Sequence, residues 1–353
     1  MFIYLLLFGL EIVTIPIYVY EKKLYLIING TCLWLLMAYR NYSVGVDTST
    51  YKSFFYQSGM YNVNSTLRNW FFPFHERFEN GFIFLNHIVY NISPNFQLMI
   101  MVTSAIMIVC FTFFVIQLNI NYVIGLIAYE SIFMANCMNL MRQGLAICLC
   151  MVAFAYVIKG KPFRFLLFTY IATTMHVTAW IFLPIYFIRK IKLNKKGIIA
   201  FLFVAGVIFL SFETLYTKLS SIIDEAQSFS GDVANNNYNG LTNIIISSAI
   251  VIFILYISKQ FKNNDLLFID SQLMLLCALI IYILAIKFSQ ISRMSLFFMP
   301  GLFPILSYVV GYDFKKNRIL VTIMIIIGLI LYFVVIQKYR PEWAGIVPYS
   351  FSF

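Results

Sequence analysis

The sequence predicts an all-α fold, a polytopic integral membrane protein with about ten spanning helices. Hydrophobic residues make up 61% of the 353 residues and charged residues only 11%, whereas soluble domains carry roughly 25% charged residues. Long apolar runs also recur from one end of the chain to the other. In a bilayer such runs must pair their backbone polar groups internally, as helices do. Because no polar segment is long enough for a soluble domain, we expect a single integral membrane domain over residues 1–353.

Short basic clusters between the apolar runs predict the orientation of the chain. Fifteen of the 25 Lys and Arg residues lie in five clusters, at residues 21–23, 159–164, 189–196, 259–262 and 313–318. Lys and Arg concentrate in cytoplasmic loops, so we expect these clusters inside and the segments 40–80, 213–240 and 337–353 outside, with both termini external. The same clusters explain the net charge of +11 without a nucleic-acid partner.

The apolar runs between these markers predict the helices in order. The first run, MFIYLLLFGLEIVTIPIYVY, has no basic residues before it and no small-residue cleavage site, so we expect a retained helix rather than a signal peptide. A spanning helix needs about 20 apolar residues, with a range of roughly 17–25. The predicted helices are 1–19, 24–39, 96–117, 121–139, 144–158, 198–212, 241–258, 266–286, 294–311 and 319–336.

Two segments do not fit simple spanning helices. Residues 81–92 are too short to cross and precede Ser93-Pro94, so we expect an interfacial or re-entrant helix. Residues 165–188 lie between two basic clusters that are both expected inside, so the segment must cross the membrane an even number of times. Two spanning helices need roughly 40 residues, and this segment is too short for them. We therefore expect a re-entrant pair of half-helices that breaks near ATTMHVTA, with His176 at its tip.

The cysteine and loop patterns indicate no cofactor. All six cysteines lie inside apolar segments, where we expect them to pack. Cys148 and Cys150 have the wrong spacing for zinc and no histidine beside them. No D-x-D pair on the outer segments would hold a divalent metal, and no G-x-x-x-x-G-K-[ST] loop would bind a nucleotide. We expect neither a metal nor any other cofactor.

Polar side chains collect on the predicted outer side of the membrane. They are Arg40, Asp47, Tyr51, Glu76, Glu79, Arg142, Gln143, His176, Lys287 and Arg293. A charge at the bilayer centre costs roughly 2.5–3.5 kcal/mol on insertion scales, so such residues usually face a cavity or a partner. A single interfacial arginine is explained by snorkelling to lipid headgroups. Three arginines with a carboxylate and a histidine favour an anion site.

A diphosphate attached to a lipid matches both the charge and the location of these residues. Guanidinium groups bind phosphate oxygens bidentately and stay charged at any relevant pH. For His176 the alternative is that it only satisfies backbone groups in the helix break. Inside the predicted spans, we expect Asp270 to be structural, while the role of Glu130 is open.

The order and spacing of these residues resemble the EpsG family, membrane proteins of the Wzy type. The first motif has the pattern R-x4-G-x-D-x3-Y-x3-F, from Arg40 to Phe55. The later motifs are Glu79-Asn80-Gly81-Phe82, Arg142-Gln143-Gly144-Leu145-Ala146, His176-Val177-Thr178-Ala179, and Arg293 before Phe297-Phe298. The chain departs from the family pattern at Met175, where an aromatic often stands, and at Leu296, which makes Arg293 the weakest match.

The resemblance implies a glycosyltransferase that polymerises lipid-linked repeat units of exopolysaccharide, capsule or O-antigen. Such polymerases transfer the growing glycan from undecaprenyl diphosphate to a terminal hydroxyl of an incoming lipid-linked unit. This occurs at the outer face of the cytoplasmic membrane of bacteria. The implied partners are the lipid-linked donor and acceptor, the bilayer, a chain-length regulator and a flippase. The identity of the sugars does not follow from the sequence.

The resemblance also implies roles for the outer residues. Arg142 and Arg40, with Arg293, would stabilise the departing diphosphate. Asp47, Glu79 or His176 would accept the proton of the attacking hydroxyl, and the choice among these three is open. Asp47 would otherwise contact sugar hydroxyls. The remaining substrate-binding candidates are Tyr51 and Gln143.

Three other functions are compatible with the composition. A transporter or flippase of lipid-linked sugars would use a similar cavity, but is expected to show two related halves or paired broken helices. The sequence indicates one broken segment without a matching partner. A membrane O-acyltransferase would need an acyl donor from the cytoplasm, whereas the polar residues collect outside. A purely structural role as an assembly subunit would not explain the set of outer arginines.

Overall fold

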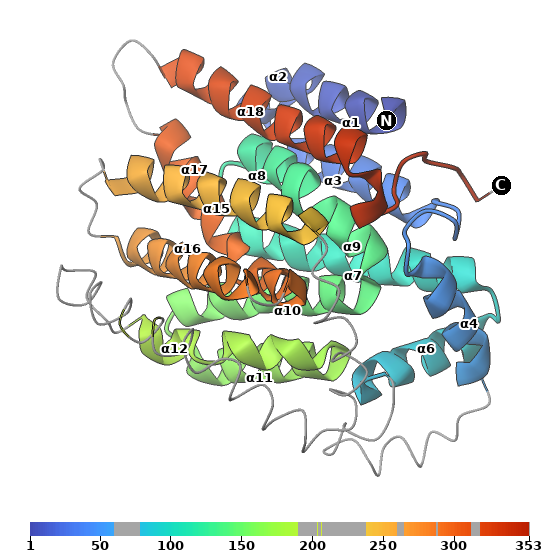
Figure 1. The fold of residues 1–353 in the computed structure, drawn as a ribbon. Coiled ribbons are helices and arrows are strands. Elements are labelled where there is room, and N and C mark those ends of the chain that lie inside the picture. Colours follow the sequence, from blue (N-terminus) through green and yellow to red (C-terminus); the bar gives the residue numbers. More distant parts are fainter. Residues whose placement is uncertain are drawn as a thin grey trace. The chain divides into compact units, whose positions relative to one another are not determined.

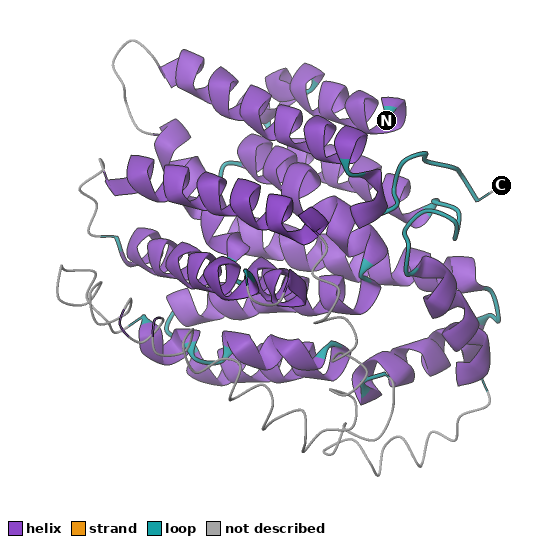
Figure 2. Cartoon of the chain, in the orientation of Figure 1, coloured by secondary structure: helices purple, strands orange, loops and turns teal. Residues whose placement is uncertain are grey.

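The chain is all-helical over the residues that the computed structural model describes. These are residues 1–59, 78–189, 203, 206, 238–259, 265–286, 289–311 and 318–352. They contain no β-strand, only an isolated bridge between Arg40 and Phe351 (Figure 2). The predicted all-α fold class is therefore confirmed for the described part of the chain.

The chain divides into two compact units. The first consists of Met1–Leu183 and Leu306–Phe353, and the second of Pro184–Ile305. Figure 1 colours the first unit blue to green and again red. Whether the two units form the single integral domain expected from the sequence stays a prediction.

Four described helices are long and apolar enough to cross a membrane. They are α7 (Phe96–Gln117), α10 (Met141–Ile158), α16 (Leu266–Ala285) and the Ile319–Tyr339 part of α18 (Arg318–Tyr339). A bent pair, Ile291–Phe297 with Met299–Gly311, would make a fifth span with a 42° bend. The expected number of about ten spans is not confirmed.

Several of the other predicted helices are present but short or interrupted. The first breaks at Thr14 into α1 (Phe2–Val13) and α2 (Ile15–Tyr20), because Pro16 lacks the N–H that would continue the α-helical pattern. The second is α3 (Lys22–Ala38), with 17 residues. Predicted helix 121–139 is divided into α8 (Tyr122–Ala128), the π-helix η2 (Tyr129–Met134) and α9 (Ala135–Asn139).

The second unit supplies the remaining helices. Its described helices are α12 (Ile185–Ile188), α15 (Tyr238–Lys259), α16, the 3-10 helices η4 (Ser289–Phe297) and η5 (Met299–Gly301), and the start of α17 (Leu302–Gly311). The predicted helix 198–212 lies outside the described residues except at 203 and 206, and the predicted external loop 213–240 is described only from 238.

The two irregular segments are placed where the sequence predicted them. Residues 81–92 fall in α6 (Asn80–Ile92), whose 13 residues are too few to cross a bilayer. The segment 165–188 contains the end of α11 (Pro162–Met175), an extended residue at His176, η3 (Val177–Phe182) and α12 (Ile185–Ile188). The predicted break is therefore present at His176, while re-entry into the membrane stays a prediction.

Helix α10 forms the centre of the first unit. It packs against α7 and α11. In its 18-residue apolar stretch 83% is buried, compared with 11% in the corresponding stretch of α18. Gly144 permits the close approach of α9, because a Cβ there would lie 2.9 Å from the Cα of Cys137. Since α10 is surrounded by protein, any charged residue on it must find a partner inside the unit. Arg142, in its first turn, is such a residue.

Candidate active site

Three residues from three separate helix ends meet in the first unit. Glu79 precedes α6, Arg142 lies in the first turn of α10, and His176 follows α11. Glu79 Oε2 accepts a hydrogen bond from Arg142 Nη1 at 2.7 Å, and Glu79 Oε1 accepts one from His176 Nδ1 at 2.8 Å. The backbone N–H of Val177 also donates to Glu79 Oε1, at 3.0 Å. Both oxygens of one carboxylate thus orient a cation and an imidazole.

Gly81 allows α6 to begin directly beside the end of α11. A Cβ at this position would lie 2.7 Å from the Cβ of Thr174 and 2.8 Å from its carbonyl oxygen. Contacts under 3.0 Å between such atoms are not tolerated, so any larger residue would push the two helices apart. The glycine in the predicted Glu79-Asn80-Gly81-Phe82 motif therefore serves the approach of Glu79 to His176.

The environment of Glu79 keeps its carboxylate ionised. Burial raises its pKa, but the hydrogen bond from His176, the charge of Arg142 and the Val177 N–H outweigh burial and lower the pKa to about 2. A group that is ionised and already holds three donors does not accept a further proton near neutral pH. Of the three predicted bases, Glu79 is the one that its surroundings make unsuitable.

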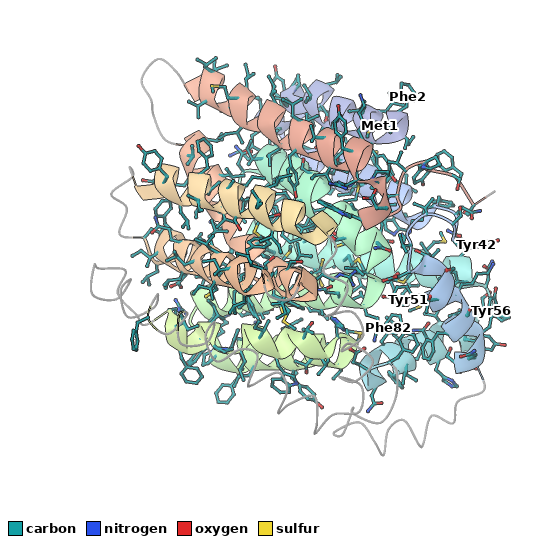
Figure 3. The ribbon with its side chains drawn as sticks, viewed as in Figure 1. Met1, Phe2, Tyr42, Tyr51, Tyr56 and Phe82 are labelled. Carbon is teal, nitrogen blue, oxygen red and sulfur yellow. The ribbon has the colours of Figure 1, made fainter. Side chains whose placement is uncertain are left out.

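Arg142 is held against aromatic rings and stays partly accessible. Its guanidinium carbon lies 4.6 Å from the ring centroid of Phe78, and it interacts with the hydroxyl of Tyr51. Tyr51 packs edge-on against Phe82 at 5.7 Å, and Figure 3 shows these two side chains next to each other. The Arg142 side chain is 21% exposed. A positive charge with an aromatic wall on one side can therefore still meet an anion on the other.

His176 presents its second ring nitrogen away from Glu79. The side chain is 20% exposed, and its Nδ1 is engaged by Glu79. Among the described residues Nε2 has no hydrogen-bond partner. With Nδ1–H donating to the carboxylate, the neutral ring carries a lone pair on Nε2, which is the arrangement of a histidine base held by an acid.

Asp47 has a half-buried carboxylate next to this cluster. Asp47 precedes α4 (Thr48–Ser58), and its carboxylate makes no hydrogen bond to any described residue. It is close enough to act electrostatically on Tyr51, one helical turn later, which in turn reaches Arg142. The structure therefore brings Tyr51, Arg142, Glu79 and His176 together, and Asp47 lies one helical turn before Tyr51.

Arg40 lies in the protein interior instead of at the mouth of this group. Its side chain is 1% exposed, and the guanidinium donates to the carbonyl oxygens of Met37 and Met138 and to Ser104 Oγ. Burial lowers the pKa of Arg40 to about 10, which leaves it charged at neutral pH. The expected contact with a diphosphate finds no support in this geometry, because the side chain is buried and its Nη1 and Nη2 already donate to protein oxygens.

The other predicted residues are placed as follows. Gln143 is buried at the start of α10. Arg293 is exposed on η4 of the second unit, so its relation to the group around Arg142 stays a prediction. Glu76 and Lys287 lie outside the described residues. Glu130 is fully buried in the π-helix η2, where its carboxyl group interacts with that of Glu11 on α1.

Sequence reasoning missed two residues of the site. Phe78 directly precedes the Glu79 motif, and this position next to the motif was the available signal. Asn139 lies three residues before Arg142 and carries the backbone of Asp47, through a hydrogen bond from the Asp47 N–H to Asn139 Oδ1 at 2.9 Å. Nothing in the local sequence marks this contact, since the two residues are far apart in the chain.

The described residues hold no group of three or more His, Cys, Asp or Glu that could bind a metal ion. What the site offers is a fixed cation at Arg142, an oriented imidazole at His176 and an available carboxylate at Asp47. Such a set can stabilise a departing anion, accept a proton and bind hydroxyl groups.

The family model described as EpsG family matches residues 23–351, nearly the whole chain. The match includes every residue of the site. No curated protein and no solved structure matches the chain.

Proposed function

Because the chain belongs to the EpsG family, we propose that it is a membrane glycosyltransferase of the Wzy type. Its reaction would be the polymerisation of oligosaccharide repeat units linked to undecaprenyl diphosphate. The family supports the polymerase class, and the donor and the lipid are part of the proposal. The partners would be a lipid-linked donor and acceptor, with a flippase and a chain-length regulator acting on the same substrates.

The observation that carries the proposal is the shared carboxylate of Glu79. It holds Arg142 at 2.7 Å and His176 at 2.8 Å, so a guanidinium and an oriented imidazole share one carboxylate. Glycosyl transfer from a diphosphate needs these two groups at one site, because negative charge develops on the leaving group while the acceptor hydroxyl loses its proton.

In the proposed step an acceptor hydroxyl attacks the anomeric carbon of the donor. A C–O bond forms to the hydroxyl oxygen while the C–O bond to the diphosphate breaks, and the lipid diphosphate leaves with the electron pair. The hydroxyl proton moves to Nε2 of His176, and Glu79 stabilises the imidazolium that results. Arg142 stabilises the charge on the departing diphosphate, an effect that is usually among the largest in catalysis.

The remaining residues would bind the substrate. Asp47 would accept hydrogen bonds from sugar hydroxyls, because its carboxylate has no partner in the described chain. Tyr51, whose hydroxyl interacts with Arg142, and Gln143, the next residue in the chain, would bind the substrate. Arg293 stays a substrate-binding candidate on the sequence motif alone. Arg40 would act as a structural residue below the site. The site would face the outer side of the cytoplasmic membrane, on the argument from the basic clusters.

The test of the base is the substitution His176→Gln, which keeps size and hydrogen bonding but removes basicity. Turnover of a lipid-diphosphate-linked repeat unit by the purified protein should fall roughly 10²–10⁴-fold. Binding of the donor should change little, since a base acts mainly in the transition state.

The matched control is His87→Gln, on α6, whose ring meets the carbonyl oxygen of Ser58 at 3.2 Å and takes no part in the site. It should keep near-normal turnover. Near-normal turnover in His176→Gln would instead transfer the base role to Asp47 and leave His176 as a support for the helix break.

A transporter or flippase of lipid-linked sugars is the second candidate, because the structure adds a second broken segment. One break is at His176 in the first unit, and the other is the 42° bend between Ile291–Phe297 and Met299–Gly311 in the second. Paired broken helices are typical of transporters. Purified protein in detergent micelles separates the candidates: a polymerase lengthens glycan chains there, whereas a transporter needs a sealed vesicle and leaves chain length unchanged.

A further inference from the structure

The C-terminal tail, residues 344–352, forms backbone hydrogen bonds with the loop that leads to Asp47. Its backbone runs antiparallel to residues 39–46, through hydrogen bonds from Ser352 N to Tyr39 O at 3.0 Å, Asn41 N to Ser350 O at 2.9 Å and Gly45 N to Gly345 O at 2.8 Å. Figure 1 shows the red tail running beside the blue loop that precedes α4. About 300 residues of chain separate the two partners, so this contact exists only in the folded protein.

Side chains fix the tail in place. The hydroxyl of Tyr349 donates to the carbonyl oxygen of Leu36, and that of Tyr4 to the carbonyl oxygen of Ile346, both at 2.8 Å. The side chain of Ile346 is 0% exposed. Gly345 has φ +63, and a Cβ there would lie 3.0 Å from the backbone nitrogen of Val46. The tail is therefore packed into the first unit and not merely laid on its surface.

Asn139 connects the tail and the loop to the start of α10, the helix that carries Arg142. Its Oδ1 accepts from the Asp47 N–H at 2.9 Å, and its Nδ2 donates to the carbonyl oxygen of Trp343 at 3.4 Å. Asn139 is 3% exposed, so both bonds are shielded from water. Gly45, with φ +102, lets the loop come this close, because a Cβ there would lie 3.3 Å from the Cα of Asn139.

We propose that Asn139 is a positioning residue that, together with the C-terminal tail, fixes Asp47 to receive the acceptor sugar. This proposal rests on the proposed glycosyltransferase function. Only two residues separate Asn139 from Arg142. The junction between α9 and α10 therefore carries both the side chain that binds the Asp47 backbone and the guanidinium of Arg142. The backbone of Asp47 is thereby tied to the helix end that carries Arg142, the residue proposed to meet the diphosphate. The ligand chemistry is a polyhydroxylated sugar that donates hydrogen bonds to Asp47.

The first experiment measures whether Asn139 keeps the tail docked. A cysteine at position 346, from Ile346→Cys, is shielded while the tail is docked, so N-ethylmaleimide should label it slowly in the full-length protein. Adding Asn139→Ala should raise the labelling rate roughly tenfold or more. The matched control is Asn136→Ala, one turn earlier, whose side chain reaches only the carbonyl oxygen of Ile132. Equal labelling rates with Asn139→Ala and Asn136→Ala would overturn the proposal.

The second experiment measures coupling to Asp47. Asn139→Ala should lower polymerisation roughly 10- to 100-fold, as small misplacements of binding groups do, with the loss mainly in KM for the acceptor. The double variant with Asp47→Ala should be no worse than Asp47→Ala alone, because Asn139 acts by placing the Asp47 carboxylate, which Asp47→Ala removes. Losses that add, or full activity of Asp47→Ala, would overturn the positioning role. Lack of polymerisation by the unaltered protein would instead overturn the proposed function.

The third experiment tests whether the tail stays docked during turnover. Ser43 Oγ and Ser350 Oγ lie 3.1 Å apart, and both residues are exposed. The pair Ser43→Cys and Ser350→Cys should therefore form a disulfide under mild oxidation. We expect the cross-linked protein to polymerise as fast as the reduced one. Activity only after reduction would show that the tail must leave, and would overturn its role as a fixed support.

Discussion

The arrangement of the site depends on the three hydrogen bonds that the Glu79 carboxylate accepts. Glu79 takes hydrogen bonds from Arg142, His176 and the backbone of Val177. We therefore propose that Glu79 orients other groups, and its low pKa follows from these donors. By contrast, Asp47 and His176 each keep an atom free of protein partners in the described chain. The division between supporting and reacting residues follows from this difference.

The first prediction at this scale concerns Glu79→Gln. Since the folded pKa of about 2 lies below the ordinary value near 4.3, the ionised carboxylate stabilises the fold above pH 4.5 or so. The variant should lose on the order of 3 kcal/mol at pH 7. That difference should shrink as the pH falls through 4 toward 2. Thermal unfolding of the purified protein measures it.

The control for this experiment is Glu342→Gln, whose carboxylate is exposed and 3.7 Å from Arg340. An exposed pair of this kind contributes roughly 0–1 kcal/mol, so little change is expected at any pH. A loss in Glu79→Gln that stays constant from pH 7 to pH 3 would show that the carboxylate charge is not what stabilises the site.

The second prediction separates the two arginines. Arg142→Ala should abolish the polymer ladder while the protein accumulates normally, and Arg142→Lys should rescue poorly because an ammonium lacks the bidentate fork. Arg40→Ala should instead reduce the amount of folded protein, because it leaves the carbonyl oxygens of Met37 and Met138 buried without donors. Gel analysis of the surface glycan and quantification of the membrane protein decide between them. Normal accumulation of Arg40→Ala without polymer would restore Arg40 to the substrate site.

At the scale of the elements, the site is built from helix ends that approach closely. The beginnings of α6 and α10 and the end of α11 converge at Glu79. Gly81 permits the approach of α6 to α11, because a Cβ there would lie 2.7 Å from the Cβ of Thr174. Helix ends also leave backbone N–H groups unpaired, and Glu79 uses one of these at Val177. The break at His176 is thus part of the site and not only a feature of membrane insertion.

The prediction at this scale is that Gly81→Ala disrupts the site without touching a reacting group. The added methyl must displace Thr174, which typically costs 1–3 kcal/mol in overpacking and moves Glu79 away from His176. Polymerisation should fall at least tenfold. Gly9→Ala, in α1, is the control, because a Cβ there meets nothing within 4 Å. Equal activity of the two variants would show that the approach of α6 to α11 is not needed.

At the scale of the whole molecule, the pairing of residues 39–46 with the C-terminal tail constrains the topology. Two segments joined by backbone hydrogen bonds must lie on the same side of the membrane. The positive-inside argument had placed both of them outside from separate basic clusters. The side of the membrane on which residues 39–46 lie therefore fixes the side of the C-terminal tail, and the reverse.

The topology prediction is tested by labelling single cysteines on intact cells with a membrane-impermeant thiol reagent. Ser65→Cys, Ser230→Cys and Ser350→Cys should react, and Asn194→Cys, in the most basic cluster, should not. The unaltered protein is the control for its native cysteines. Labelling at position 194 alone would reverse the orientation and place the site on the cytoplasmic face.

The sequence by itself determined the features that depend on neighbouring residues. The apolar runs predicted most of the helices, the ATTMHVTA stretch predicted the break at His176, and the motif order predicted the family. These features are local or additive along the chain, so periodicity and composition are enough to find them. The number of spans was harder to predict, because Pro16 and the π-helix η2 interrupt runs whose composition alone would suggest a full span.

Only the tertiary structure decided which polar residues work together. Arg40 and Arg142 both lie at helix ends, yet contacts with Met138 and Ser104 bury the first, while Glu79 holds the second in an accessible place. Glu79 and His176 are 97 residues apart, and the tail and its loop are about 300 apart. Burial and hydrogen-bond partners at such separations arise from the packing of helices against one another, which no local pattern records. For this reason the residues of the site could be named from the sequence, but their roles could not.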